Sequence, residues 1–223
     1  AGDTTQSLAA ELEEALADST LELPTKFGFA IDDGASRVLA GDSADVRIER
    51  DRSGGLLVRA DGDKLGRSVA RGEAVTTALA FADWFVTSGG ARGGRGRMAA
   101  HLSAGAILSA ALRGEAEPAP IMAAARPGLY SQGAMVGVAF GQMAHATLNQ
   151  FAGCGHALRM TPWRMVLSEG KRTMPNATGL ITEAYDPALR VIACSGAPRC
   201  REAHADTRGL AAALAPNIGA AAR

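Results

Sequence analysis

The chain has 223 residues with 23 basic and 23 acidic side chains, so its formal net charge is zero. This balance argues against a nucleic-acid partner and against binding to an acidic membrane surface, because both select basic proteins. Hydrophobic residues make up 47% of the sequence and aromatic residues only 4%, which predicts a globular protein with a core of small aliphatic side chains. No apolar run approaches the roughly 18 residues of a membrane span. The polar start and the odd count of three cysteines argue against a secreted protein, and we expect a cytoplasmic location.

The first segments predict an amphipathic helix followed by a sheet. Residues 4–20 place Leu8, Leu12 and Leu16 at helical spacing, and Pro24 ends this helix. The run K-F-G-F-A-I alternates apolar and small side chains and ends at a D-D-G turn, which predicts a strand. Further elements are expected as strands over 45–49, 55–60 and 65–69, a hairpin turn at D-R-S-G-G, and a helix over 73–86.

The sequence S-G-G-A-R-G-G-R-G-R over residues 88–97 is the most unusual composition in the chain, and it precedes a helix expected over 98–112. Glycine lets the backbone approach a ligand closely, and the planar guanidinium of arginine matches carboxylates. Arg92, Arg95 and Arg97 are therefore candidate ligand contacts. A flexible basic loop without a ligand explains the same composition. No G-K-[ST] follows, so this loop does not match a phosphate-binding P-loop.

A proline-rich segment over 114–127 predicts a linker or domain crossover, after which a new unit begins. Residues 136–140 alternate as a strand, and 141–151 have the apolar spacing of a helix. Residues 158–168 are expected to form a second strand, in which Trp163 packs in the core.

The last part of the chain places two cysteines on one short loop. The apolar residues Leu189, Val191 and Ile192 predict a short buried strand, and a Gly/Pro turn then holds Cys194 and Cys200 before an Ala-rich helix. Cysteine thiolates hold iron–sulfur clusters, and a helix N-terminus favours the deprotonated thiol. The C-x5-C spacing therefore suits two corners of one cluster. Two ordinary reduced cysteines are the alternative.

Three stretches resemble the sulfite and nitrite reductase superfamily: L-P-T-K-F-G-F-A-I-D-D-G, T-P-W-R and A-C-S-G-A-P-R-C. The third, followed by A-D-T-R, is most similar to the precorrin-3B synthase family within it. The resemblance implies that Cys194 and Cys200 are two of four ligands to a [4Fe-4S] cluster, with the other two in a later C-x3-C pair. It also suggests substrate-carboxylate contacts at Lys26 and Arg164 and at the arginines of the Gly-rich loop. A solvated strand end and a surface ion pair are the alternatives for Lys26 and Arg164.

The fold class implied by this resemblance is α+β, with a sulfite/nitrite reductase-like cofactor domain, one ferredoxin-like half-module and the start of a second cofactor domain. The expected boundaries are an N-terminal helix and linker over 1–22, the first cofactor domain over 23–126, the half-module over 127–184, and the iron–sulfur domain over 185–223. Because the C-x3-C pair is absent from these residues, we expect an internal fragment of the family layout or a cluster shared with a second chain.

The activity implied is that of an oxidoreductase of aerobic cobalamin biosynthesis, which hydroxylates precorrin-3A with O2 and forms a lactone. The expected cofactors are a [4Fe-4S] cluster and a mononuclear non-haem iron. The expected partners are precorrin-3A, O2, an electron donor and a second chain that supplies the missing cluster ligands. Two alternatives stay open: a fragment of a siroheme-dependent sulfite or nitrite reductase, against which the D-D-G turn counts, and a catalytically silent tetrapyrrole-binding module.

No residues can be assigned to the second iron from the sequence. The four histidines, at 101, 145, 156 and 204, show no paired metal spacing, and each is expected to be a surface or packing residue. Cys154 matches no ligand of the family and is expected to be a small buried thiol.

Overall fold

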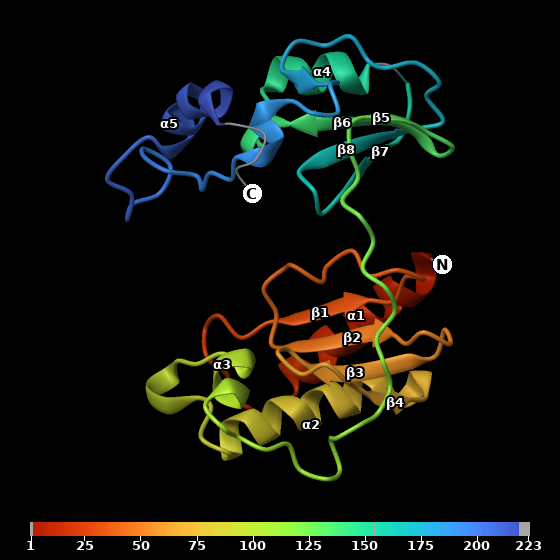
Figure 1. Ribbon diagram of the computed structural model, residues 1–223, viewed down its shortest axis with the longest axis vertical. Helices are drawn as coiled ribbons and strands as arrows, with labels where there is room; N and C mark the ends of the chain where they lie inside the picture. Colours follow the sequence, from red (N-terminus) through yellow and green to blue (C-terminus); the bar gives the residue numbers. More distant parts are fainter. Residues whose placement is uncertain (1, 154, 219–223) are drawn as a thin grey trace. The chain divides into compact units, whose positions relative to one another are not determined.

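The computed structural model describes residues 2–153 and 155–218 and divides into two compact units, Ala1–Ala123 and Ala124–Arg223. Each unit combines helices with its own β-sheet, so the predicted α+β class is confirmed (Figure 1). In the part of the chain that the structure describes, no helix has the length and apolar character needed to span a membrane.

The first unit is built on a four-stranded sheet in the order β1-β2-β3-β4. Strand β1 is parallel to β2, whereas β2, β3 and β4 pair antiparallel. The D-R-S-G-G turn joins β2 to β3 as a hairpin, as predicted, and Gly54 at its tip has a φ of +89°. The elements are α1 (Gly2–Ala17), β1 (Phe29–Asp32), β2 (Val46–Arg50), β3 (Leu56–Ala60), β4 (Arg67–Val69), α2 (Ala74–Thr87) and α3 (Met98–Ser103).

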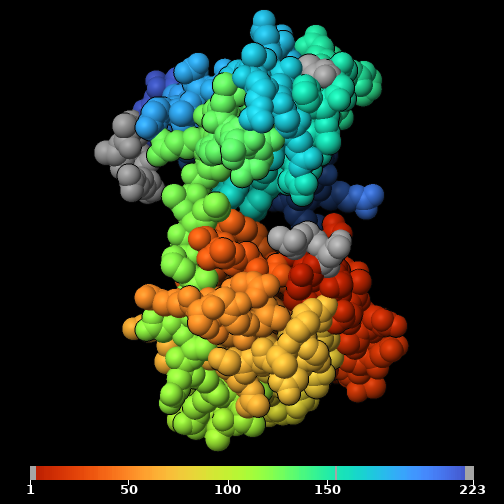
Figure 2. Space-filling view, turned by 90° about the vertical axis from the view of Figure 1, so that its right-hand side faces the viewer, coloured from red at the N-terminus to blue at the C-terminus, as the bar shows by residue number. Residues whose placement is uncertain are grey.

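Helices α1 and α2 cover one face of this sheet and form the main core. The apolar periodicity of α2 turns Phe81 and Phe85 onto Ile48 and Val58 of the sheet, and Leu8 of α1 joins the same cluster. The two helices are in contact, and the space-filling view shows α1 (red) beside α2 (yellow) at the surface (Figure 2). Because these helices and strands bury an apolar face in this core, their apolar residues recur with the period of a helix or of a strand.

The opposite face of the sheet is buried by irregular segments. Residues 116–121 run along it and form isolated bridges that pair Arg37 with Ile121 and Asp51 with Pro118. Underneath lie charged side chains of β2 and β3, among them Arg47, Glu49 and Arg59, which are all less than 8% exposed. Both faces of β2 are therefore covered, although its alternating sequence is typical of a strand with one solvated face.

The second unit contains an antiparallel sheet in the order β5-β6-β8-β7, with β9 pairing to β6. Helix α4 covers one face, where Phe151 packs with Val136 and Val166. The other face holds Met135 and Leu167 together with the partly buried Trp163, which confirms the predicted core position of this tryptophan. The elements are β5 (Gly128–Tyr130), β6 (Gly133–Val138), α4 (His145–Ala152), β7 (Leu158–Met160), β8 (Met165–Glu169), β9 (Leu180–Ile181), η4 (Pro187–Arg190) and α5 (Thr207–Leu214).

Two predicted elements are shorter or broken in the structure. The helix expected over 98–112 ends at Ser103, and Gly105 then adopts a φ of +99° that a helix does not permit. The strand expected over 158–168 is a hairpin, because the T-P-W-R residues form the turn between β7 and β8, with Arg164 at a φ of +57°.

The prediction of a short buried strand before the cysteine loop is wrong. Residues Pro187–Arg190 form the 3-10 helix η4, which Asp186 caps by accepting a hydrogen bond from the amide of Ala188. Proline at the first position of a helical turn needs no amide hydrogen, so the D-P pair favours this turn over a strand. Ile192 is 84% exposed rather than buried. The Ala-rich helix expected after the loop is present as α5.

Candidate functional site

The cysteine loop is held by its own backbone. The amide of Cys200 donates to the carbonyl of Gly196 at 2.8 Å, and the amide of Ala197 donates to that of Ala205 at 2.9 Å. Gly196 has a φ of +61°, and a Cβ at this position would collide with the Thr207 hydroxyl. Glycine is thus required both by the backbone conformation and by the close approach of α5 to the loop.

Thr207, at the start of α5, contacts the first cysteine of the loop. Its hydroxyl oxygen lies 3.0 Å from the carbonyl oxygen of Cys194 and 3.5 Å from the Cys194 Sγ, so its single proton can be donated to either atom. Asp206 caps the helix by accepting from the amide of Gly209 at 3.0 Å. The D-T pair of the A-D-T-R motif therefore both starts the helix and brings a donor to the thiol.

The surroundings of Cys194 favour the thiolate form of its side chain. Donation from the Thr207 hydroxyl and then from the Gly196 backbone lowers the pKa of the Cys194 thiol, and the positive charge of Arg208 acts in the same direction. The side chain is exposed, and Cys194 and Cys200 are both free thiols. Thiolates are the form of cysteine that binds metals and attacks electrophiles. The arrangement therefore suits either ligation or nucleophilic chemistry at Cys194.

The loop can supply two thiolate ligands of a metal or cluster. Among the residues that the structure describes, no group of three or more His, Cys, Asp and Glu side chains could hold a metal ion. Cys154 lies outside those residues. The donor chemistry fits two corners of an iron–sulfur cluster, whose remaining ligands would have to come from elsewhere.

The activation of Cys194 predicts how its alkylation depends on pH. Because the lowered pKa leaves more thiolate at neutral pH, iodoacetamide should modify Cys194 several-fold faster at pH 7 than it does in Thr207→Val, which lacks the hydroxyl donor. The difference should vanish above the ordinary thiol pKa of about 8.5, where Cys194 is ionised in both the wild type and the variant. Residues 191–199 form a tryptic peptide whose only cysteine is Cys194, so mass spectrometry can follow this site alone. Thr207→Ser keeps the hydroxyl and should keep the wild-type rate, and the exposed control Thr76→Val should also leave the rate unchanged. If Thr207→Val and the wild type react at equal rates at pH 7, the proposed role of Thr207 is contradicted.

Arg164 belongs to the same unit but is engaged with the backbone. Its Nη1 donates to the carbonyl of Val191 at 2.6 Å and its Nη2 to that of Leu189 at 2.9 Å. The side chain thereby ties the β7–β8 turn to the segment that leads into Cys194. Sequence reasoning expected a substrate contact here; the geometry gives Arg164 two bonds that hold the cysteine loop in position.

The remaining site residues predicted from the sequence lie in the first unit, and they differ in exposure and in their contacts. Lys26 is exposed in the turn before β1, and Arg92 and Arg95 are exposed on the Gly-rich loop. Arg97 instead pairs with the fully buried Asp45 at 2.9 Å and donates to the carbonyl of Ala44 at 3.0 Å. Lys26, Arg92 and Arg95 keep exposed cationic heads, whereas Arg97 is part of the packing between the loop and β2.

A shallow hollow adjoins the Gly-rich loop. Its volume is about 360 Å³, and it is lined by Glu22 and Leu23 together with Gly89, Arg92 and Gly94. Arg92 therefore lines a concavity of the first unit. The predicted groups fall into two sets, one in the first unit and one at the cysteine loop of the second unit.

Thr207, at the start of α5, was not identified as a functional residue from the sequence. The signal for Thr207 was present, because a D-T pair directly before an Ala-rich run is typical of a helix N-terminus. His101, one of the histidines expected to pack or to lie at the surface, contacts Trp84 and Phe85 with its ring and pairs with the Ser88 hydroxyl at 2.8 Å.

Comparisons with known proteins found no matching family model, no similar curated protein and no similar solved structure.

Proposed function

We propose that this chain is part of an oxidoreductase similar to precorrin-3B synthase, in which Cys194 and Cys200 are two of the four thiolate ligands of a [4Fe-4S] cluster. The observation that supports the proposal is the exposed Cys194 thiol with a lowered pKa, held on one loop with a second free thiol. A structural cysteine would be buried and unactivated. The three stretches that resemble the family include this loop.

The proposed reaction is the hydroxylation and lactonisation of precorrin-3A by O2. One oxygen atom enters the substrate and the other leaves as water, which takes two electrons and two protons from an external donor. The bound cluster would supply electron transfer. The other chemistry required of this chain is to hold a macrocycle with many carboxylates.

The two loops have separate roles in this proposal. The exposed guanidinium groups of Arg92 and Arg95, with the ammonium of Lys26, are free to pair with substrate carboxylates. Arg97 and Arg164 act as positioning residues, because each makes two hydrogen bonds within the protein. The fold expected from the resemblance, a reductase-like cofactor domain followed by a ferredoxin-like half-module, is part of the same proposal.

Such a cluster takes four thiolates and the loop supplies two, so the other two come either from the later C-x3-C pair of the family layout or from a second copy of the chain. Two copies that each contribute Cys194 and Cys200 would satisfy this count. The bridged form then requires a dimer whose stability depends on the metal.

The decisive measurement is iron and acid-labile sulfide per chain after reconstitution without oxygen. We expect about four iron and four sulfide per two chains, with a brown thiolate-to-iron absorption and a dimer by light scattering. Cys194→Ser should lose the cluster and return to a monomer, whereas Cys154→Ser should keep both. Circular dichroism of each variant separates ligand loss from unfolding.

The other outcomes distinguish the alternatives. A wild-type chain that remains colourless and iron-free, while binding a tetrapyrrole added to it, would overturn the cluster and favour a silent binding module. A siroheme spectrum after addition of siroheme, with sulfite reduction, would favour the reductase fragment. Retention of iron by Cys194→Ser would remove this cysteine from the ligand set.

A further inference from the structure

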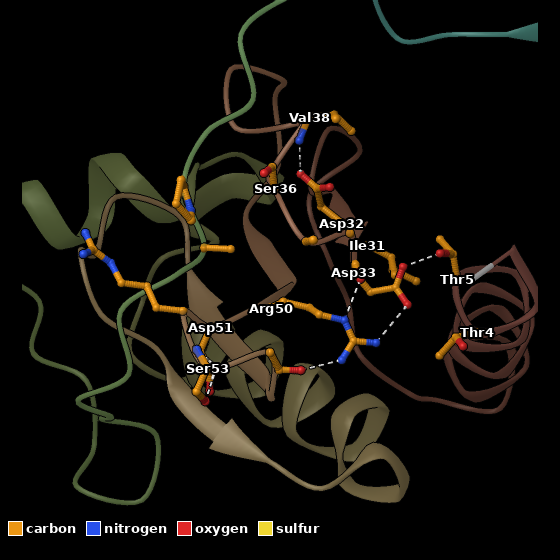
Figure 3. Close-up of a pocket in the computed structure, with 16 residues that line it drawn as sticks. Thr4, Thr5, Ile31, Asp32, Asp33, Ser36, Val38, Arg50, Asp51 and Ser53 are labelled. Atoms are coloured by element: carbon orange, nitrogen blue, oxygen red, sulfur yellow. Dashed lines mark hydrogen bonds and ion pairs between the residues drawn. The ribbon is translucent and has the colours of Figure 1, made fainter. Parts of the chain in front are cut away.

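A larger cavity lies in the first unit, away from the predicted site residues. Its volume is about 750 Å³, in the range of small-molecule sites. Its walls come from the start of α1, the end of β1 with the D-D-G turn, the β2–β3 hairpin and residues 119–120 (Figure 3). All of these segments belong to one compact unit, so the cavity is complete within it.

Asp32 provides a buried carboxylate on the wall of this cavity. The residue is 4% exposed, and its Oδ2 accepts hydrogen bonds from the amides of Val38 and Leu39, both at 2.8 Å. Its Oδ1 accepts no hydrogen bond from the described residues, and no described cation pairs with the carboxylate. Figure 3 shows the side chain beside Val38 at the cavity. Because this oxygen has no donor among the described residues and Asp32 lines the cavity, a ligand that enters the cavity can donate to it.

The cations around the cavity are already engaged. Arg50 donates to the carbonyl of Asp33 at 2.7 Å and to that of Gly54 at 2.6 Å, and its Nη2 lies 3.9 Å from the Asp33 carboxylate. Arg52 pairs with Glu117 at 2.9 Å. The charge left without a partner at the cavity is therefore negative.

Asp51 adds to this negative charge at the hairpin. Its Oδ1 accepts from the hydroxyl of Ser53 at 2.7 Å and from the amide of Gly55 at 2.9 Å. Donation from the Ser53 hydroxyl, with backbone donors of the same turn, lowers the pKa of Asp51 and keeps it ionised. No arginine or lysine of the described chain neutralises it. Two carboxylates without cations, Asp32 and Asp51, thus line one cavity.

The rest of the lining determines what kind of cation would fit. Ile31, Val38, Ala35, Ala119 and Pro120 present apolar surface to the cavity. Among the described residues, no group of three or more His, Cys, Asp and Glu side chains could hold a metal ion. A bare metal ion would also leave the apolar wall unfilled. An organic cation suits both the carboxylate and the apolar wall of the cavity. Its charged head donates to the carboxylate, and its body covers the aliphatic side chains.

We propose that this cavity binds a small organic cation, an ammonium group on an aliphatic body, with the ammonium donating to Asp32 Oδ1. The inference stands independently of the cluster at the cysteine loop. The Asp32 carboxylate is preorganised for this contact, because two backbone amides fix its other oxygen.

A charge series of equal length tests the proposal on the full chain. Hexylammonium, 1-hexanol and hexanoate share one aliphatic body and differ in the head group. Titration of each into ¹⁵N-labelled protein should move the amide resonances of Val38 and Leu39 with hexylammonium, while the alcohol and the carboxylate leave them in place. Asp32→Asn keeps one oxygen for the two amides and replaces the other with an NH2 group. It should weaken hexylammonium binding at least about tenfold, the loss expected for a hydrogen bond between charged groups.

Two further variants separate a local contact from general charge and from misfolding. Asp42→Asn removes the same charge from an exposed residue that does not line the cavity, and it should change the affinity by less than about twofold. Ala35→Trp fills the cavity from an exposed position without altering Asp32, and it should weaken binding even if Asp32→Asn fails to fold. Preferential binding of hexanoate would overturn the proposal, as would hexylammonium binding that survives both Asp32→Asn and Ala35→Trp, or the absence of any shift on titration.

Discussion

Replacing Glu49 with alanine is expected to lower the free energy of unfolding of the first unit by about 3–5 kcal/mol, the cost of breaking a buried ion pair from one side. The Glu49 side chain is 0% exposed, and Arg59 donates to it through Nε at 3.0 Å and through Nη2 at 3.1 Å. Arg37 approaches the same carboxylate at 3.6 Å. Removal of the carboxylate leaves two guanidinium groups beneath residues 116–121 without their counter-ion.

The matched control is the exposed pair of Arg52 with Glu117. Their side chains are 70% and 57% exposed at a distance of 2.9 Å, so Arg52→Ala should cost no more than about 1 kcal/mol. Urea unfolding followed by Trp84 fluorescence, in a Trp163→Phe background, reports the first unit alone. Equal midpoints for Glu49→Ala and Arg52→Ala would mean that water reaches the buried guanidinium groups and that the network contributes little.

This network also shows where sequence reasoning reached its limit in the fold. The apolar alternation predicted β2, β3 and α2 to within one residue at most ends, because a helix covers that face of the sheet. The same alternation gives no sign that Arg47 and Glu49, on the other face of the sheet, are buried. That face is covered by loop segments, and segments without a period leave no periodic signal in the sequence.

In the candidate site, too, some features were predictable from the sequence and others were not. The turn over Cys194–Cys200 and the following helix were predictable from glycine, proline and the alanine run, which act locally. The prediction of a strand before the cysteine loop was wrong, because the D-P pair at Asp186 starts a 3-10 helix in spite of the apolar residues that follow. The contacts that Arg164 and Arg97 make within the protein were not predictable. The partners of Arg164 at Leu189 and Val191 lie 25 and 27 residues away along the chain, and Asp45 lies 52 residues from Arg97.

The cavity at Asp32 illustrates a further limit. From the sequence, D-D-G is a turn signal and part of a stretch that resembles the family, and neither predicts a cavity. Only the folded backbone shows that one carboxylate of the pair is used by Arg50 and Thr5, whereas the other keeps an oxygen without a donor. Two adjacent identical residues thus acquire different chemistry from their surroundings.

Arginines of the Gly-rich loop should likewise differ sharply in their contribution to stability. We expect Arg97→Ala to lower the free energy of unfolding of the first unit by about 2 kcal/mol, because it removes a charged hydrogen bond to a buried acceptor. Asp45 is 0% exposed and would keep its bonds from the amides of Gly28 and Met98, at 2.9 and 2.8 Å, but lose its only cation among the described residues. The exposed Arg95→Ala should stay within about 0.5 kcal/mol.

The same pair of variants decides whether Arg97 is available to a ligand. If Arg97→Ala unfolds at the wild-type urea concentration, the ion pair with Asp45 contributes nothing and the guanidinium is free to contact a substrate carboxylate. If the variant is destabilised as expected, any loss of tetrapyrrole binding in it follows from the loop, which Arg97 fixes to Asp45 and Ala44. Loss of binding in the stable Arg95→Ala would then identify the direct contact. Stability and affinity, measured on both variants, therefore separate the arginine that shapes the loop from the one that meets the ligand.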